Sequence, residues 1–109
     1  YGLPVKVAIL NNQYLGMVRQ WQEMFYNQRY SQTCLMTNPD NVKIAQAFGA
    51  VGLRATTPQE ATQVIQEALA ITDRPVVMDF RVDREANVLP MVPPNASLAK
   101  MIGGGADDR

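Results

Sequence analysis

The sequence has no histidine and a single cysteine, Cys34, among its 109 residues. One thiol cannot form an internal disulfide, and without imidazole groups the chain cannot assemble a metal cage of nitrogen and sulfur ligands. The same absence excludes a histidine general base and a histidine-containing triad. Cys34 is therefore expected to be a reduced residue that packs in the fold or lies at the surface.

The chain also lacks net charge and any long apolar run. Ten Lys and Arg balance ten Asp and Glu, and no basic stretch is long enough for a nucleic-acid footprint. The apolar runs are far shorter than the roughly 20 residues of a membrane helix, and the amino end has no signal pattern. We expect a soluble protein without nucleic-acid or membrane partners. At this length it forms at most one domain with a modest core.

Hydrophobic patterning predicts alternating strands and helices. Short β-rich runs predict strands over 4–10, 51–56 and 76–82, and apolar residues at helical spacing predict helices over 17–25, from residue 39 or 40 to 49, and over 58–71. Thr57, Pro58 and Glu60 form a capping box that opens the last helix. This order predicts an α/β fold, a parallel sheet with helices on both faces. We expect one domain portion over 1–92 and an arm over 93–109, where prolines cluster.

Two asparagines and a glutamine stand where the first predicted strand stops. Parallel α/β sheets bind ligands beyond the carboxyl ends of their strands, and Asn11, Asn12 and Gln13 lie at that edge. Amide and carbonyl oxygens suit Mg²⁺ or Ca²⁺, and the start of the following helix offers N–H groups to a phosphate. The segment fits a metal-bridged phosphate. Alternatively, Asn11 and Asn12 form a turn and cap the helix.

Longer motifs give the segment a specific resemblance. The stretch "NNQYLGMVRQWQEMFYNQRYSQT" closely resembles the catalytic subunit of acetohydroxyacid synthase (acetolactate synthase), a thiamine-diphosphate enzyme family. The motifs "NPD", "KIAQAFGAVGLRAT", "DRPVVMDF" and "NVLPMVPP" follow in the family's order. The resemblance thus spans nearly the whole chain. It implies the carboxyl-terminal part of the thiamine-diphosphate-binding domain.

The resemblance also implies roles for individual residues. Asn12 matches a side-chain ligand of Mg²⁺, and Tyr14 matches a residue that binds the metal through its backbone carbonyl. Leu15 and Gly16 match positions whose N–H groups face the diphosphate. The implied cofactor-binding segment is Asn12, Gln13, Tyr14, Leu15, Gly16 and Met17. No catalytic residue is implied within the chain, because the family's activating glutamate and its "GDG" aspartate match no position here.

The first predicted helix carries an apolar stripe that includes Met17, Val18 and Trp21. By periodicity alone this stripe would be helix core. The resemblance matches these three residues to the approach of the active site, where the family's herbicides also bind, and it replaces the helix-core interpretation for Trp21 only.

The implied activity is the condensation of pyruvate with pyruvate or 2-ketobutyrate in branched-chain amino-acid biosynthesis. The implied cofactors are thiamine diphosphate and Mg²⁺, with FAD bound mainly by an upstream domain. A homodimer or tetramer, a regulatory small subunit and a bacterial cytoplasmic location are implied as well. The 109 residues alone are expected to be inactive.

Two other interpretations remain open. One is a related thiamine-diphosphate enzyme, such as a 2-keto acid decarboxylase or oxidase, against which "GMVRQWQ" argues. The other is a free-standing α/β module that binds a phosphate ligand without catalysis.

Overall fold

A computed structural model describes residues 2–103, which divide into two compact units. The first, the sheet unit, comprises Tyr1–Tyr14 and Cys34–Arg84. The second, the α1 unit, comprises Leu15–Thr33 and Glu85–Arg109. Within the described residues, no helix has the length and apolar character that a membrane crossing requires.

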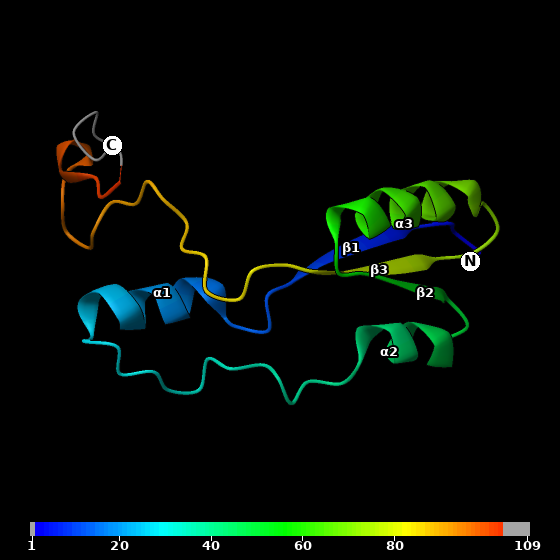
Figure 1. Cartoon of the computed structure of the whole chain (residues 1–109), viewed down its shortest axis with the longest axis horizontal. Coiled ribbons are helices and arrows are strands. Elements are labelled where there is room, and N and C mark those ends of the chain that lie inside the picture. The colour runs from blue at the N-terminus through cyan, green and yellow to red at the C-terminus, as the bar shows by residue number, and fades with distance from the viewer. Residues whose placement is uncertain (1, 104–109) are drawn as a thin grey trace. The chain divides into compact units, whose positions relative to one another are not determined.

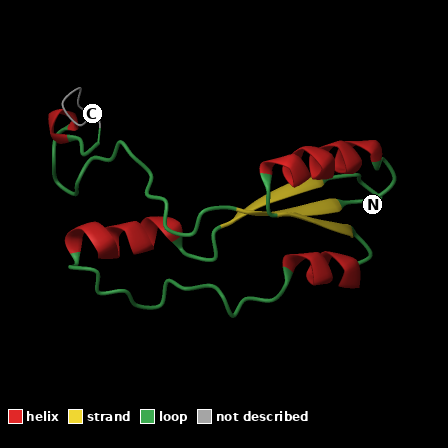
Figure 2. Ribbon diagram, viewed as in Figure 1, coloured by secondary structure: helices red, strands yellow, loops and turns green. Residues whose placement is uncertain are grey.

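The sheet unit is a small α/β layer structure (Figure 1). Its three strands are parallel in the order β1-β3-β2, and their bounds are β1 Lys6–Asn11, β2 Val51–Ala55 and β3 Val76–Arg81. Helix α3 (Pro58–Ala70) covers one face, and α2 (Asn41–Ala47) covers the other (Figure 2). The predicted parallel sheet with helices on both faces is confirmed. Each predicted strand and helix is present within two residues of its expected start.

Local signals explain where these elements begin. The Thr57 hydroxyl accepts a hydrogen bond from the Glu60 N–H, and the Glu60 carboxylate accepts one from the Thr57 N–H, so the predicted capping box is formed. Asp40 caps α2 by accepting from the N–H groups of Val42 and Lys43. The ends of both helices nearest the carboxyl edge of the sheet are thereby fixed by side chains.

The apolar core lies between α3 and the sheet. It contains Ala55, Val64, Ala68, Val76 and Met78. Val76 and Met78 project from one face of β3 because alternate residues of a strand share a face. Asp79, between Met78 and Phe80, projects toward the α2 face, where it is fully buried. The two faces of the sheet therefore differ in chemistry, apolar under α3 and partly ionic under α2.

Helix α2 approaches β2 unusually closely at Gly52. A Cβ atom on Gly52 would lie 2.6 Å from the carbonyl oxygen of Val42 and 2.9 Å from its Cα. Both atoms belong to the backbone of α2. Only a residue without a side chain fits this contact.

In the α1 unit, helix α1 (Gly16–Phe25) buries the side that periodicity marks as polar. Gln20 is 1 % exposed. Its amide nitrogen donates to the Val88 carbonyl and its amide oxygen accepts from the Val88 N–H, at 2.9 Å each. Arg19 is also buried and pairs with Glu23 at 2.7 Å. For Met17, Val18 and Trp21, which are exposed, the interpretation as helix core is therefore wrong here. The segment that follows β3 covers the polar side through hydrogen bonds, which hydrophobic periodicity does not register.

The rest of the α1 unit is irregular. A short 3-10 helix, η1, spans Leu98–Lys100, and an isolated antiparallel bridge joins Met91 to Ile102. The division at residue 92 into a domain portion and an arm stays a prediction, and residues 104–109 of that arm lie outside the described residues.

Candidate functional site

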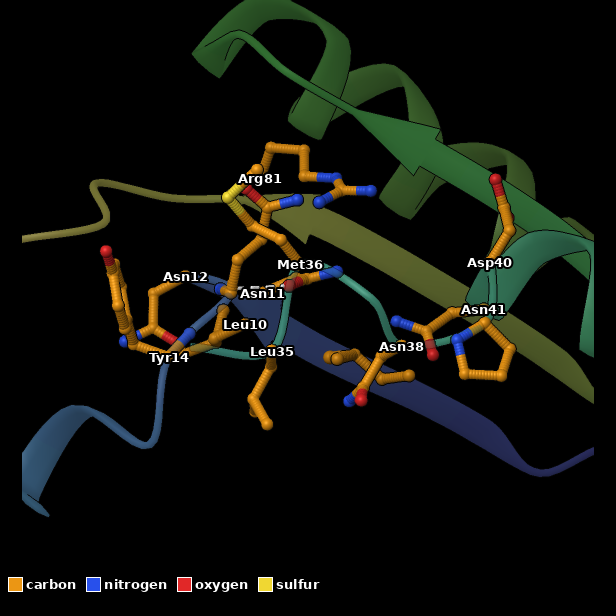
Figure 3. Close-up of a pocket in the computed structure, with 13 residues that line it drawn as sticks. Leu10, Asn11, Asn12, Tyr14, Leu35, Met36, Asn38, Asp40, Asn41 and Arg81 are labelled. Atoms are coloured by element: carbon orange, nitrogen blue, oxygen red, sulfur yellow. Dashed lines mark hydrogen bonds between the residues drawn. The ribbon is translucent and has the colours of Figure 1, made fainter. Parts of the chain in front are cut away.

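A polar pocket of about 360 Å³ opens at the carboxyl end of β1 (Figure 3). All of its walls belong to the sheet unit. They come from the end of β1 and the residues after it, from the segment before α2, and from the end of β3. The lining side chains include Asn11, Asn12, Gln13, Tyr14, Asn38, Asp40, Asn41 and Arg81. The structure thus places the predicted Asn12, Gln13 and Tyr14 on one pocket at the expected edge of the sheet.

Two consecutive Asx turns shape the chain after β1. The side-chain oxygen of Asn11 accepts from the Gln13 N–H at 3.1 Å, and that of Asn12 accepts from the Tyr14 N–H at 3.2 Å. Gln13 adopts a left-handed conformation with φ of 59°. Its carbonyl accepts from the N–H of Leu35 at 2.8 Å. The turn is therefore stabilised by its own two amides and by the backbone N–H of Leu35.

The predicted turn is present, but the predicted helix cap is not. The residue that caps α1 is Leu15, and no side chain caps this helix start. The first turn of α1 also carries no acidic residue. A helix start without a capping side chain or nearby carboxylate keeps its positive end available to an anion.

A buried ionic network lies beneath the Asx turns. One oxygen of Asp79 accepts from the Asn11 amide nitrogen at 2.8 Å. The other accepts from Arg54 Nε at 3.1 Å and lies 3.6 Å from Arg81 Nε. Arg54 also bonds Asp40, the cap of α2, at 2.8 Å. The network joins all three strands to the start of α2.

The Asp40 end of this network makes stability depend on pH. The Arg54 guanidinium, helped by the Lys43 N–H, holds the pKa of the Asp40 carboxyl below its ordinary value of 3.8. A carboxyl whose pKa is depressed by folding stabilises the fold above the ordinary pKa, and this contribution is lost as the pH falls toward the folded-state pKa.

We therefore expect the Asp40→Asn protein to lose less of its melting temperature than wild type between pH 6 and about pH 3. Asparagine keeps the helix cap but cannot be protonated in this range, so the substitution isolates the charge. Thermal melts at a series of pH values measure the effect. If the melting temperatures of the two proteins fall equally between pH 6 and about pH 3, protonation of the Asp40 carboxylate is not coupled to folding.

The apolar stripe of α1 lines a second pocket, which lies wholly within the α1 unit. Its volume is about 410 Å³, and its walls are Met17, Val18, Trp21, Gln22, Tyr26 and Arg29. Met17 is 54 %, Val18 50 % and Trp21 37 % exposed. The Trp21 ring packs edge-on against Phe25, with centroids 5.9 Å apart. The three residues matched to the active-site approach thus share one open apolar surface.

Sequence reasoning missed the residues of the buried network as site residues. Asp79 interrupts the apolar run "VVMDF", and a charge within a buried parallel strand is an available signal because it requires a partner. The partners Asn11 and Arg54 come from other strands, so the sequence does not identify them. Cys34, expected in the fold or at the surface, is exposed.

The fold and the pocket together define an α/β ligand-binding domain with a polar site at the carboxyl edge of a parallel sheet. A family model, the thiamine pyrophosphate enzyme C-terminal TPP-binding domain, matches residues 1–80. The chain belongs to this family.

Characterised relatives agree with the resemblance seen in the motifs. The chain is 54 % identical over 100 residues to an acetolactate synthase of Mycobacterium leprae, a match that covers 88 % of this chain and 16 % of that protein. It is 41 % identical over 102 residues to the acetolactate synthase large subunit of Haemophilus influenzae, which covers 94 % of this chain and 18 % of that protein. For the isozyme 2 large subunit of Escherichia coli the identity is 42 % over 100 residues, 92 % of this chain and 18 % of that protein. The resemblance to acetolactate synthase is confirmed, and the chain spans less than a fifth of the length of these relatives.

Proposed function

We propose that the protein carrying this chain is an acetolactate synthase catalytic subunit. It condenses pyruvate with a second pyruvate or with 2-ketobutyrate, in the biosynthesis of branched-chain amino acids. The observation that carries the proposal is the pair of Asx turns at the end of β1, which present Asn12 and Tyr14 at a polar pocket just before the uncapped start of α1. The family match over residues 1–80 covers this segment, and the identity to acetolactate synthases supports the same assignment.

The proposed metal ligands are the side-chain oxygen of Asn12 and the backbone carbonyl of Tyr14, which would hold Mg²⁺. Both are neutral oxygen donors, the type that Mg²⁺ accepts when phosphates supply the remaining ligands and charge. The Asn12 oxygen accepts one hydrogen bond, from the Tyr14 N–H, and an amide oxygen has a second lone pair. The donor set therefore fits a metal bridged to a diphosphate.

Leu15, Gly16 and Met17 are proposed to bind the diphosphate through the start of α1, with Gln13 positioned by its turn. Backbone N–H groups and the positive end of the helix favour this ligand. Thiamine diphosphate, when bound, supplies the carbanion chemistry that no side chain of the described residues provides. The chain's own residues bind and orient the cofactor. The 109 residues alone are expected to form no acetolactate.

The remaining parts of the proposal concern the whole enzyme. FAD is assigned to a region outside this chain, whose relatives are several times longer. A homodimer or tetramer is proposed. A regulatory small subunit is a further proposed partner, because relatives are named large subunits. The proposed location is the bacterial cytoplasm.

A product assay of the purified full-length protein with pyruvate tests this function. Acetolactate that forms only with thiamine diphosphate and Mg²⁺ supports the synthase. Release of acetaldehyde or acetate without condensation would favour a related decarboxylase or oxidase. Cofactor binding without any turnover of 2-keto acids would favour the non-catalytic module.

Trp21 provides a selectivity prediction. In the full-length enzyme, Trp21→Leu is expected to lower the preference for 2-ketobutyrate over pyruvate as acceptor while the protein stays folded. The ring is partly exposed in an apolar pocket, and one methylene of a substrate is worth about 1–3 kcal/mol of contact there. A competition assay that offers both acceptors, run beside a melting curve, measures the change.

Tyr30→Leu is the matched control, since Tyr30 is an exposed aromatic residue of the same unit that does not line the pocket. This variant should keep the wild-type product ratio. An unchanged ratio in Trp21→Leu together with a collapsed melting temperature would instead make Trp21 a structural residue.

A further inference from the structure

The carboxylate of Asp79 is fully buried and does not line the pocket of the proposed metal site. A buried carboxylate is costly unless its oxygens are paired with donors. The structure pairs both oxygens, with Asn11 on one side and with Arg54 and Arg81 on the other. This arrangement ties a charge in the central strand to the first residue of the Asx turns.

The carboxylate determines which way the Asn11 amide faces. A carboxylate only accepts hydrogen bonds, so the nitrogen of the Asn11 amide must face Asp79. The amide oxygen is then directed at the Gln13 N–H, 3.1 Å away. That bond closes the first Asx turn, and the second turn, at Asn12, follows directly.

We propose that Asp79 is a positioning residue that acts through Asn11 to orient Asn12 and the Tyr14 carbonyl toward the metal. This inference rests on the proposed function, because it takes Asn12 and Tyr14 as the ligands of Mg²⁺. Arg54 and Arg81 hold the carboxylate in place. The Arg54–Asp40 bond anchors Arg54 to the start of α2.

Asp79→Asn is the informative substitution because it changes one oxygen into a nitrogen without changing shape. The two arginines attract the remaining oxygen of residue 79, which turns its new NH₂ group toward Asn11. Asn11 must then present its oxygen to residue 79 and its nitrogen to the Gln13 N–H. Two donors face each other there, so the first Asx turn opens.

The test measures binding of thiamine diphosphate by the full-length enzyme at fixed Mg²⁺, by calorimetry. We expect Asp79→Asn and Asn11→Ala each to raise the dissociation constant about 10- to 100-fold, as for other groups that orient metal ligands. At saturating cofactor, kcat should stay near the wild-type value. The double variant should bind no more weakly than either single variant, since both changes remove the same connection.

Asp73→Asn is the matched control. Asp73 also pairs with an arginine, Arg74 at 2.6 Å, but the pair is exposed and lies before β3. Wild-type affinity in this control, beside weakened binding in Asp79→Asn, supports the positioning role. Wild-type affinity in both Asp79→Asn and Asn11→Ala would overturn it, and additive losses in the double variant would overturn the route through Asn11.

Asn12→Ala serves as the reference that separates this inference from the proposed function. If Asn12→Ala weakens binding but Asp79→Asn and Asn11→Ala do not, the positioning role fails and the metal assignment stands. If Asn12→Ala also binds as wild type, the metal assignment itself fails. Should Asp79→Asn melt too low to assay, Asn11→Ala decides alone, because it leaves the arginines paired with Asp79.

Discussion

Asn12→Ala in the full-length enzyme is expected to weaken the apparent affinities for Mg²⁺ and for thiamine diphosphate together. The Asn12 oxygen is proposed to bind the metal that bridges to the diphosphate, so the loss of one ligand affects both partners. Losing a direct ligand should cost at least the 10- to 100-fold typical of groups that only orient ligands. Titrations of activity and of binding heat against each cofactor, with the other held in excess, measure the two affinities.

Asn12→Asp provides a graded comparison. It keeps an oxygen at the same position, so its effect on cofactor affinity should be milder than that of Asn12→Ala. It also adds a negative charge beside a phosphate, so the affinity should depend differently on pH. Asparagine and aspartate at position 12 can both accept a hydrogen bond from the Tyr14 N–H, which lies 3.2 Å from the Asn12 oxygen in the structure. A cofactor titration in which Asn12→Ala matches wild type would reduce Asn12 to a turn residue.

Gly52→Ala is expected to destabilise the sheet unit strongly for so small a substitution. The added Cβ would lie 2.6 Å from the Val42 carbonyl oxygen, closer than real contacts allow. Helix α2 must shift away from β2 to admit it, and overpacking of this kind costs about 1–3 kcal/mol. Thermal and denaturant melts of the full-length protein measure the loss.

The position of the clash makes the prediction sharper. The nearest atoms are the backbone oxygen and Cα of Val42, and its side-chain Cγ1 is 3.0 Å away. Shortening that side chain therefore cannot restore the space. We expect Gly52→Ala combined with Val42→Ala to stay as unstable as Gly52→Ala or to be less stable. Recovery of the wild-type melting temperature would show that only the Val42 side chain was in the way.

Local chemistry made much of the fold predictable. Thr57 and Glu60 satisfy each other's backbone over three residues, so the start of α3 is visible in the sequence. The change of an apolar run into amides predicted the end of the first strand at residue 10, one residue before the observed end of β1 at Asn11. In both cases the determining partners lie within a few residues of one another.

The missed features depend on partners that lie far apart in the chain. Asp79 meets Asn11 across 68 residues, because β3 lies between β1 and β2 in the sheet. Gln20 and Val88 are also 68 residues apart, and this pairing buries the polar side of α1. A hydrophobic pattern assigns sides to a helix by composition and does not include such hydrogen bonds. The sequence therefore predicted the position of the site but not the hydrogen bonds of Asp79 and Arg54 that stabilise it.

Helix α1 buries its polar side and exposes its apolar side, so the residues that hold the helix differ from those that form its open surface. Gln20 anchors the buried side through two hydrogen bonds to the backbone of residue 88, which any residue except proline can make. Met17, Val18 and Trp21 take no part in that anchoring. Substitutions among these three therefore leave the hydrogen bonds of Gln20 in place. If this surface is the proposed approach to the active site, we expect substitutions on it to change acceptor preference or inhibitor binding at little cost to the folding of α1.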